Sequence, residues 1–162
     1  YSDKYKLHYA ITMPHQSTIV LAIAATIHIT PVHACWEEAA NKYGINPYLL
    51  YAIAKTESSL NPNAFNRNKN GSYDIGLMQI NSIWLPTLRK YGLTERHLYD
   101  PCTSIQVGAW ILAQNMQRWG NSWDAVGAYN SANPTYRLPY AMKVYRNLPP
   151  ALRNKKHQQD DE

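Results

Sequence analysis

The sequence predicts a mainly α-helical single domain of about six helices. The length of 162 residues suits one domain. Hydrophobic residues make up 45% of the chain and charged residues 17%, which is a composition that can bury a core. Most segments begin at a helix-capping residue and end at Gly or Pro, the usual marks of helix boundaries.

The first two helices are bounded by such residues. Residues 35–44 form a short amphipathic pattern that ends at Gly44, a residue type that commonly terminates helices. Asn46 followed by Pro47 is a capping residue with proline at the first helical position, so a helix is predicted over residues 47–58. Residues 61–75 are rich in Asn and Gly and predict a polar loop or a small β-hairpin.

The second half of the chain continues the helical pattern. Asp100-Pro101 repeats the cap-then-proline pair, and a short helical turn is predicted from Thr94. We predict the other helices over residues 82–90, 101–119, 122–129 and 139–148. The charged tail, residues 149–162, lacks apolar anchors and is predicted to be disordered.

The beginning of the chain has the pattern of an export signal. Residues 18–30 form an apolar run that is too short for a comfortable transmembrane helix. Val32 and Ala34 then occupy the −3 and −1 positions of a cleavage site. We therefore expect residues 1–34 to be a signal peptide, with Met13 as a candidate start, and a periplasmic or secreted protein. An uncleaved anchor or a buried helix is the alternative.

Cleavage after Ala34 would make Cys35 the first mature residue. Its thiol could be acylated, as in a lipoprotein, or could pair with Cys102, the only other cysteine. An even number of cysteines in an exported chain favours the disulfide, and His33 with Val32 fits an acylation signal poorly.

Composition excludes some classes of function. The net charge is +5, but Lys and Arg are scattered singly, so we expect no nucleic-acid partner. Four of the six His fall in residues 1–34, one is in the tail and His97 stands alone, so we expect no metal site and no cofactor. Thirteen Tyr and five Trp against one Phe suit sugar binding, although such residues also fill cores.

One carboxylate falls on an apolar helical face. Leu50, Ile53, Ala54 and Glu57 stand three or four residues apart in the predicted helix 47–58, which places them on one side. Burial there would raise the pKa of Glu57, as a proton donor to a glycosidic oxygen requires. A glutamate that caps the helix end or reaches solvent is the simpler reading of this position alone.

Four further patterns occur in order along the chain. They are a Glu-Ser pair within residues 54–62, Gly-Leu-Met-Gln-Ile at 76–80, Ala-Tyr-Asn at 128–130 and Tyr-x-x-Lys-Val at 140–144. They resemble the motifs of the soluble-lytic-transglycosylase-like family, which is related to goose lysozyme. The resemblance covers most of residues 35–148 and implies a lysozyme-like catalytic domain that cleaves the MurNAc-GlcNAc β-1,4 bonds of peptidoglycan glycan strands.

The chain is most similar to the small specialised members of that family. These accompany type III or type IV secretion, conjugation and pilus systems, so the resemblance implies a secretion or conjugation apparatus as partner, and we expect a monomer. They carry a Cys at the mature N-terminus and a second in an Asp-Pro-Cys segment. Asp100-Pro101-Cys102 matches that segment, so the resemblance supports a disulfide between Cys35 and Cys102.

The resemblance also implies roles for single residues. Glu57 matches the catalytic acid/base. The other motif residues are expected to bind substrate, line the cleft floor or hold the catalytic carboxyl: Ser58, Met78, Gln79, Tyr129, Asn130 and Tyr140. The family's usual Gly after the third motif is missing, because Ser131-Ala132 follows Asn130 here. This loss is expected to reshape the cleft rim.

Asp74 leaves the reaction type open. Lysozyme-like hydrolysis uses a second carboxylate, whereas many lytic transglycosylases use one Glu and form a 1,6-anhydro product. Asp74 lies in the loop before Gly76 and is either a catalytic partner of Glu57 or a solvated turn residue. The hypotheses are therefore a lytic transglycosylase, a hydrolytic muramidase of the same fold, or a glycan-binding assembly factor that has lost catalysis.

Overall fold

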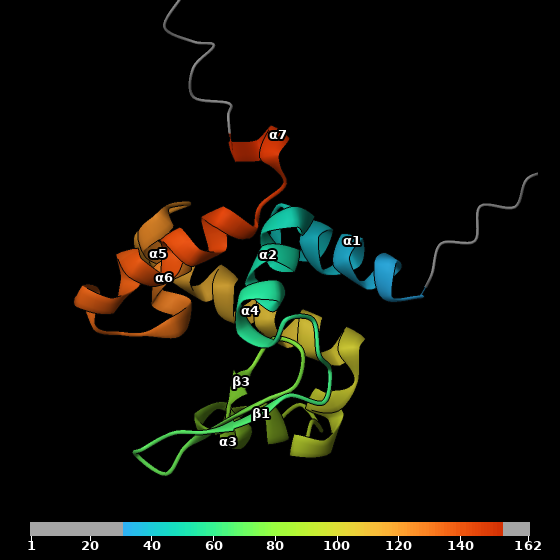
Figure 1. Ribbon diagram of the computed structural model, residues 1–162. Coiled ribbons are helices and arrows are strands. Elements are labelled where there is room, and N and C mark those ends of the chain that lie inside the picture. The colour runs from blue at the N-terminus through green and yellow to red at the C-terminus, as the bar shows by residue number, and fades with distance from the viewer. Residues whose placement is uncertain (1–30, 154–162) are drawn as a thin grey trace, which may run out of the picture.

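The computed structural model describes residues 31–153, which form a mainly α-helical fold with a small sheet (Figure 1). The helices are α1 (Pro31–Tyr43), α2 (Pro47–Ser58), α3 (Leu85–Arg89), α4 (Pro101–Trp119), α5 (Trp123–Asn130), α6 (Pro134–Asn147) and α7 (Pro150–Arg153). The strands are β1 (Phe65–Arg67), β2 (Tyr73–Ile75) and β3 (Ile80–Asn81), and two 3-10 helices are η1 (Ser82–Trp84) and η2 (Glu95–Tyr99). The predicted fold class is confirmed.

Helix α4 lies at the centre of the molecule. It contacts α1, α2 and α5 as well as η2 and β3. Figure 1 shows the sheet and α3 on one side of it, with α1, α2, α5 and α6 on the other. Ile105 and Leu112 of α4 are fully buried, as are Leu50 and Ile53 of α2. The core is therefore built around α4, and burial of these apolar side chains drives the other helices onto it.

The cap-then-proline pairs set the helix starts. The side chain of Asn46 accepts from the Tyr48 backbone N–H at 2.9 Å, and that of Asp100 accepts from Thr103 N–H at 2.8 Å. The predicted helices over 47–58 and 101–119 are confirmed to the residue.

The last long helix begins earlier than predicted. It starts at Pro134, because Asn133 accepts from the Thr135 N–H at 3.1 Å and gives α6 the same cap-then-proline start. Pro139, taken from the sequence as the first residue, lies inside α6. It removes one backbone N–H donor in the second turn, and packing of α6 on α2 and α5 offsets that loss.

Three other boundaries differ from the sequence prediction. Helix α1 begins at Pro31, so the predicted cleavage site after Ala34 falls in its first turn; residues 1–30 of the predicted signal peptide lie outside the described residues. The predicted helix 82–90 is divided into η1 and α3. The predicted disordered tail begins with the short helix α7, where Tyr145 donates to the Arg153 carbonyl at 2.7 Å. Residues 154–162 lie outside the described part of the chain.

Residues 61–75, which were predicted to form a polar loop or a small β-hairpin, contain a hairpin. Strands β1 and β2 pair in antiparallel fashion. The sequence did not indicate β3, which continues the sheet in the order β1-β2-β3 and places Asp74 opposite Asn81. The sheet therefore places β2, which precedes the Gly-Leu-Met-Gln-Ile block, beside β3, which begins at the last residue of that block. Within residues 31–153, no helix is both long and apolar enough to cross a membrane.

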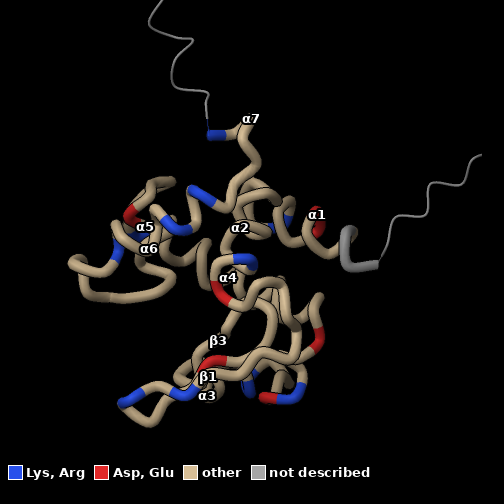
Figure 2. The backbone as a smooth tube through the Cα atoms, viewed as in Figure 1, with Lys and Arg blue, Asp and Glu red and all other residues tan. Residues whose placement is uncertain are grey.

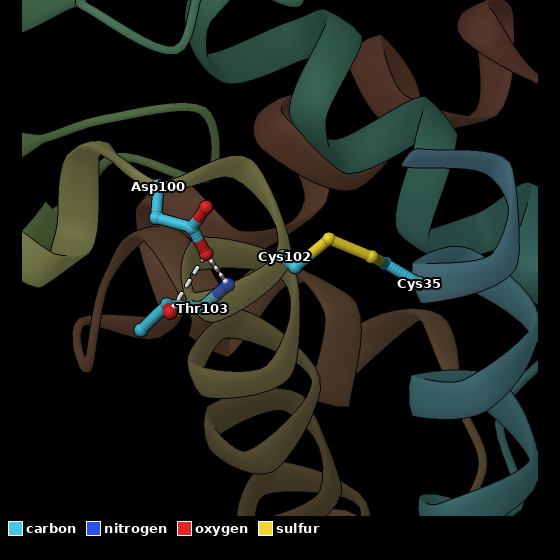
Figure 3. Close-up of a disulfide and its surroundings, with 4 residues drawn as sticks. All are labelled: Cys35, Asp100, Cys102 and Thr103. Carbon is cyan, nitrogen blue, oxygen red and sulfur yellow. Dashed lines mark hydrogen bonds between the residues drawn. A yellow bond between two sulfur atoms is a disulfide. The ribbon is translucent and has the colours of Figure 1, made fainter. Parts of the chain in front are cut away.

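A disulfide joins Cys35 in α1 to Cys102 in α4, with 5.4 Å between the two Cα atoms (Figure 3). The bond lies beside the start of α4, where Asp100 accepts hydrogen bonds from both the backbone N–H and the hydroxyl of Thr103. It connects positions 67 residues apart in the chain, so it removes conformational freedom from a long loop of the unfolded state. The predicted pairing is confirmed.

Replacing both cysteines, Cys35→Ala with Cys102→Ala, is expected to lower the free energy of unfolding by about 3–4 kcal/mol. Urea unfolding followed by circular dichroism measures this difference. Reduction should destabilise the wild type by a similar amount and leave the double variant unchanged. A wild-type unfolding midpoint that is insensitive to reductant would contradict the stabilising role of this bond.

Candidate functional site

Glu57 lies in the last turn of α2, immediately before the helix ends. Ser59 ends the helix in the left-handed conformation, with φ of 53°. The packing of α6 on α2 brings Tyr140 to the Glu57 carboxyl, and the Tyr140 hydroxyl donates to Glu57 Oε1 at 2.5 Å. Tyr140 is itself buried, so this hydrogen bond fixes the carboxyl against a rigid ring. The contact between Tyr140 and Glu57 that the sequence predicted is therefore observed.

Burial raises the pKa of Glu57 from 4.5 to about 7, because removing the carboxylate from water disfavours its charged form. The hydrogen bond from Tyr140 opposes this rise by stabilising the charged form. The negative charge of Asp74 raises the pKa further, and the positive charge of Lys143 lowers it. Glu57 can therefore hold a proton near neutral pH, which a general acid must do.

Asp74 lies on β2 and is held by two side-chain amides. Asn68 Nδ2 donates to Asp74 Oδ2 at 2.9 Å, and Asn81 Nδ2 donates to Asp74 Oδ1 at 2.6 Å. Both carboxylate oxygens accept, so the side chain is oriented. Sequence reasoning missed Asn68 and Asn81; only the pairing of β2 with β3, which places Asn81 opposite Asp74, could have pointed to one of them.

The Gly-Leu-Met-Gln turn (residues 76–79) is fixed by side chains from three helices. Ser58 of α2 donates to the Leu77 carbonyl at 2.7 Å, and Tyr129 of α5 donates to the Met78 carbonyl at 2.9 Å. The Met78 backbone N–H donates to the hydroxyl of Ser104 on α4 at 3.1 Å. The hydroxyl protons of Ser58 and Tyr129, which were expected at the substrate and at Glu57, are thus engaged in positioning this turn.

Met78 supports the turn from beneath. Its side chain is fully buried and packs where Gly108 of α4 leaves space, since a Cβ at Gly108 would come within 2.7 Å of Met78 Cε. The side chain therefore does not reach the surface, contrary to the expectation that it lines the cleft floor. Gln79 adopts φ of 48°, and its amide donates to the Gly76 and Ala64 carbonyls at 3.0 and 3.2 Å.

The two tyrosines near Glu57 remain protonated. Burial is the largest cause that raises the pKa of Tyr129 well above 10, and the charge of Glu57 adds to it. Burial also raises the pKa of Tyr140 well above 10, again helped by Glu57. Both hydroxyls are therefore permanent donors, Tyr140 to the carboxyl and Tyr129 to the turn carbonyl.

Asn130 is exposed at the end of α5, and the loop that follows it is the one expected from the sequence to form the cleft rim. Arg137 holds this loop: it donates to the Ala132 carbonyl at 2.7 Å and pairs with Asp124 at 2.8 Å. Ser131 is extended, with φ of −153°, so the chain turns here without a left-handed residue. The loop that lacks the family's Gly is thus held by a buried arginine, which the sequence alone did not reveal.

Comparison with known proteins agrees with this arrangement. A family model described as "Transglycosylase SLT domain" matches residues 34–137. The invasion protein IagB of Salmonella typhimurium is 46% identical over 118 residues, which is 70% of this chain and 74% of that protein. Protein IpgF of Shigella flexneri is 43% identical over 117 residues, 69% of this chain and 77% of that protein.

A solved structure shares the fold. It is an inactive mutant of the lytic transglycosylase Slt from Pseudomonas aeruginosa, with a TM-score of 0.57 and 24% sequence identity. The match covers 70% of this chain and 22% of that one, so the chain corresponds to one part of a much longer protein. The family match spans the site residues except Tyr140 and Lys143, and on that match the chain belongs to the transglycosylase SLT domain family.

Proposed function

We propose that this protein is a peptidoglycan lytic transglycosylase that cuts the MurNAc-GlcNAc β-1,4 bond with Glu57 as its acid/base. The observation that carries the proposal is a half-buried carboxyl with a pKa of about 7, oriented by Tyr140. Such a group is protonated often enough to act as an acid and ionised often enough to act as a base at neutral pH. Membership of the transglycosylase SLT domain family supports the same reaction class.

The reaction needs two proton transfers at one carboxyl. Protonated Glu57 gives its proton to the glycosidic oxygen, the bond from C1 to that oxygen breaks, and positive charge develops on the sugar. The C6 hydroxyl of the same sugar then attacks C1, and its proton returns to the Glu57 carboxylate. The product is a 1,6-anhydro ring, no water is consumed, and Glu57 ends in its starting state.

The neighbouring residues divide the work of positioning. Tyr140 holds Glu57 Oε1, so Oε2 is the oxygen available to carry the proton. Ser58, next to Glu57 in α2, and Tyr129 of α5 hold the turn at residues 76–79. Asn130 is exposed at the end of α5, and its proposed role is to contact a sugar. Ser58 and Gln79 act on substrate through the shape of the turn, since their polar groups bond to backbone carbonyls.

Asp74 supports a second candidate, a hydrolytic muramidase. Two amides orient its carboxylate, and its charge acts on Glu57. In a hydrolase of this kind a second carboxylate activates water or stabilises the sugar cation. The products differ, because a 1,6-anhydro end is one water lighter than a reducing end.

The proposed setting is the cell wall next to a secretion, conjugation or pilus apparatus. The name of the Salmonella relative describes it as an invasion protein, which fits that setting. The disulfide fits an oxidising compartment and therefore a periplasmic or secreted protein. Local opening of the glycan mesh would give such an apparatus a passage through the wall.

Substitution Glu57→Gln should abolish cleavage, lowering kcat by at least about 1,000-fold, because the amide cannot donate and regain the proton. Release of muropeptides from purified sacculi, followed by mass spectrometry, measures both rate and product. The matched control is Glu37→Gln, which removes an exposed carboxylate from α1. If wild-type digests contained only reducing ends, the transglycosylase proposal would be wrong and the protein would be a hydrolytic muramidase.

The pH profile should shift in opposite directions in two variants. Tyr140→Phe removes a hydrogen bond that lowers the pKa of Glu57, so the alkaline limb of activity should move to higher pH. Asp74→Asn removes a charge that raises it, so the same limb should move to lower pH. Initial rates between pH 5 and 9 measure this. Shifts of the same sign in both variants would contradict the assignment of the limb to Glu57.

Stability should also report the burial of Glu57. Its folded-state pKa lies above its unfolded value, so its stabilising contribution is complete below pH 4.5 and is lost as pH rises through about 7. Glu57→Gln is therefore expected to be about 3 kcal/mol more stable than wild type at pH 8.5, with little difference at pH 4. Urea unfolding of both proteins at pH 4 and at pH 8.5 measures this difference in stability. An equal difference at the two pH values would show that Glu57 does not titrate between them.

A further inference from the structure

A groove of about 480 Å³ lies between the end of α2 and the last turns of α6, beside the Glu57 site. Three of its lining residues are cationic, namely Lys55 from α2 with Lys143 and Arg146 from α6. No carboxylate lines it. Figure 2 shows basic residues on α6 where the chain approaches α7. The groove therefore has a net positive charge, from three cations among neutral lining residues.

The three cations have no anionic partner in the described part of the chain. The ion pair found among residues 31–153 joins Arg137 to Asp124, which are not part of this groove. No hydrogen bond engages the side chains of Lys55, Lys143 or Arg146 within the same residues. Like charges that line one hollow repel each other, and an anionic ligand would relieve that repulsion.

The polar floor of the groove is fixed in place. Asn147 Nδ2 donates to the Thr56 hydroxyl at 2.9 Å, and that hydroxyl donates to the Ala52 carbonyl at 2.7 Å. This chain of bonds leaves the Asn147 side-chain carbonyl free of a described partner, so it is available to accept from a ligand N–H. Leu60 adds an apolar wall. Cations, an amide and an apolar surface together suit a peptide with free carboxylates.

The groove begins where the Glu57 site ends. Lys55 and Thr56 directly precede Glu57 in α2, and Lys143 lies one helical turn after Tyr140 in α6. The charge of Lys143 reaches Glu57 strongly enough to lower its pKa. Of the three cations, Lys143 is the one whose charge acts on Glu57, so an anionic group attached to a sugar held at Glu57 would meet the groove at its Lys143 end.

We propose that this groove binds the free carboxylates of the peptide that branches from the glycan strand. This inference rests on the proposed function, because it concerns the same substrate. Peptidoglycan is a glycan polymer whose muramyl sugars bear short peptides with free carboxylates, and each such peptide must leave the cleft next to the bond that is cut. Lys55 and Arg146 then act as specificity-determining residues that favour peptide-bearing strands over bare ones.

The test compares wild type with a Lys55→Gln, Arg146→Gln double variant on three polymers. These are peptide-bearing glycan strands, strands stripped of peptide by an amidase, and peptide-bearing strands whose free carboxyls have been amidated. The matched control carries Lys90→Gln and Arg118→Gln, an equal loss of charge at exposed sites that do not line the groove. Lys143 is left unchanged because its charge acts on Glu57.

On peptide-bearing strands the double variant should lose about tenfold in kcat/KM, since two solvent-exposed ion pairs together supply about that factor. It should match wild type on stripped and on amidated strands, and the control should match wild type on all three. An equal loss on stripped strands, or no loss on any polymer, would overturn the proposal.

A binding measurement separates this proposal from the catalytic one. A soluble disaccharide peptide with free carboxylates should shift the NMR signals of Asn147 and Ser59 in Glu57→Gln protein, and the double groove variant should weaken that binding about tenfold. Wild type that cuts none of the polymers but binds this probe would refute the catalytic function and keep the groove. Wild type that cuts the polymers but does not bind this probe would refute the groove proposal and keep the catalytic function.

Discussion

The site depends on one constraint, the fixing of the Gly-Leu-Met-Gln turn by side chains from three helices. The turn offers two adjacent carbonyls and one N–H that have no partner in the sheet. Ser58, Tyr129 and Ser104 satisfy them from α2, α5 and α4. Unsatisfied, these buried groups would each cost about 1–3 kcal/mol, so the three helix positions and the turn are specified together.

Fixing the turn also fixes what lies on either side of it. The preceding strand carries Asp74 and the following strand carries Asn81, so the turn sets the register in which these two side chains meet. Ser58 belongs to the same helical turn as Glu57, so the bond from Ser58 to Leu77 holds the end of α2 against the sheet. Met78 seals the arrangement by filling the space that Gly108 leaves in α4.

The burial that equips Glu57 for catalysis opposes folding at neutral pH. An ionised carboxylate in this position costs stability, and the hydrogen bond from Tyr140 recovers only part of it. The disulfide and the core around α4 supply stability away from the site, at Cys35 and Cys102 and at residues such as Ile105. The domain thus carries a locally unfavourable group because the rest of the fold holds it there.

Helix-capping pairs and the spacing of apolar residues correctly predicted the features that depend only on residues close in the sequence. The caps at Asn46 and Asp100 and the apolar face that bears Glu57 follow from spacing alone, and they agree with the structure. Features that depend on contacts between distant residues were missed. The two amides on Asp74 and the arginine that holds the loop after α5 through Ala132 arise from tertiary pairing, which spacing does not encode.

Met78 and α6 show two further limits of sequence reasoning. A methionine in a motif does not indicate whether its side chain faces the cleft or the core, and here the space above Gly108 decides. A proline inside a helical pattern usually suggests a boundary, yet the cap at Asn133 and packing on α2 outweighed Pro139. Both outcomes depend on the surroundings of the residue in the folded protein.

The proposed chemistry requires the fold to raise the pKa of Glu57 to about 7. The most direct measurement is the ¹³C chemical shift of the Glu57 carboxyl followed by NMR from pH 4 to 9, assigned by comparison with Glu57→Gln. Burial of the carboxyl should give a titration midpoint of about 7. A midpoint near 4.5, the ordinary value for a glutamate, would contradict it.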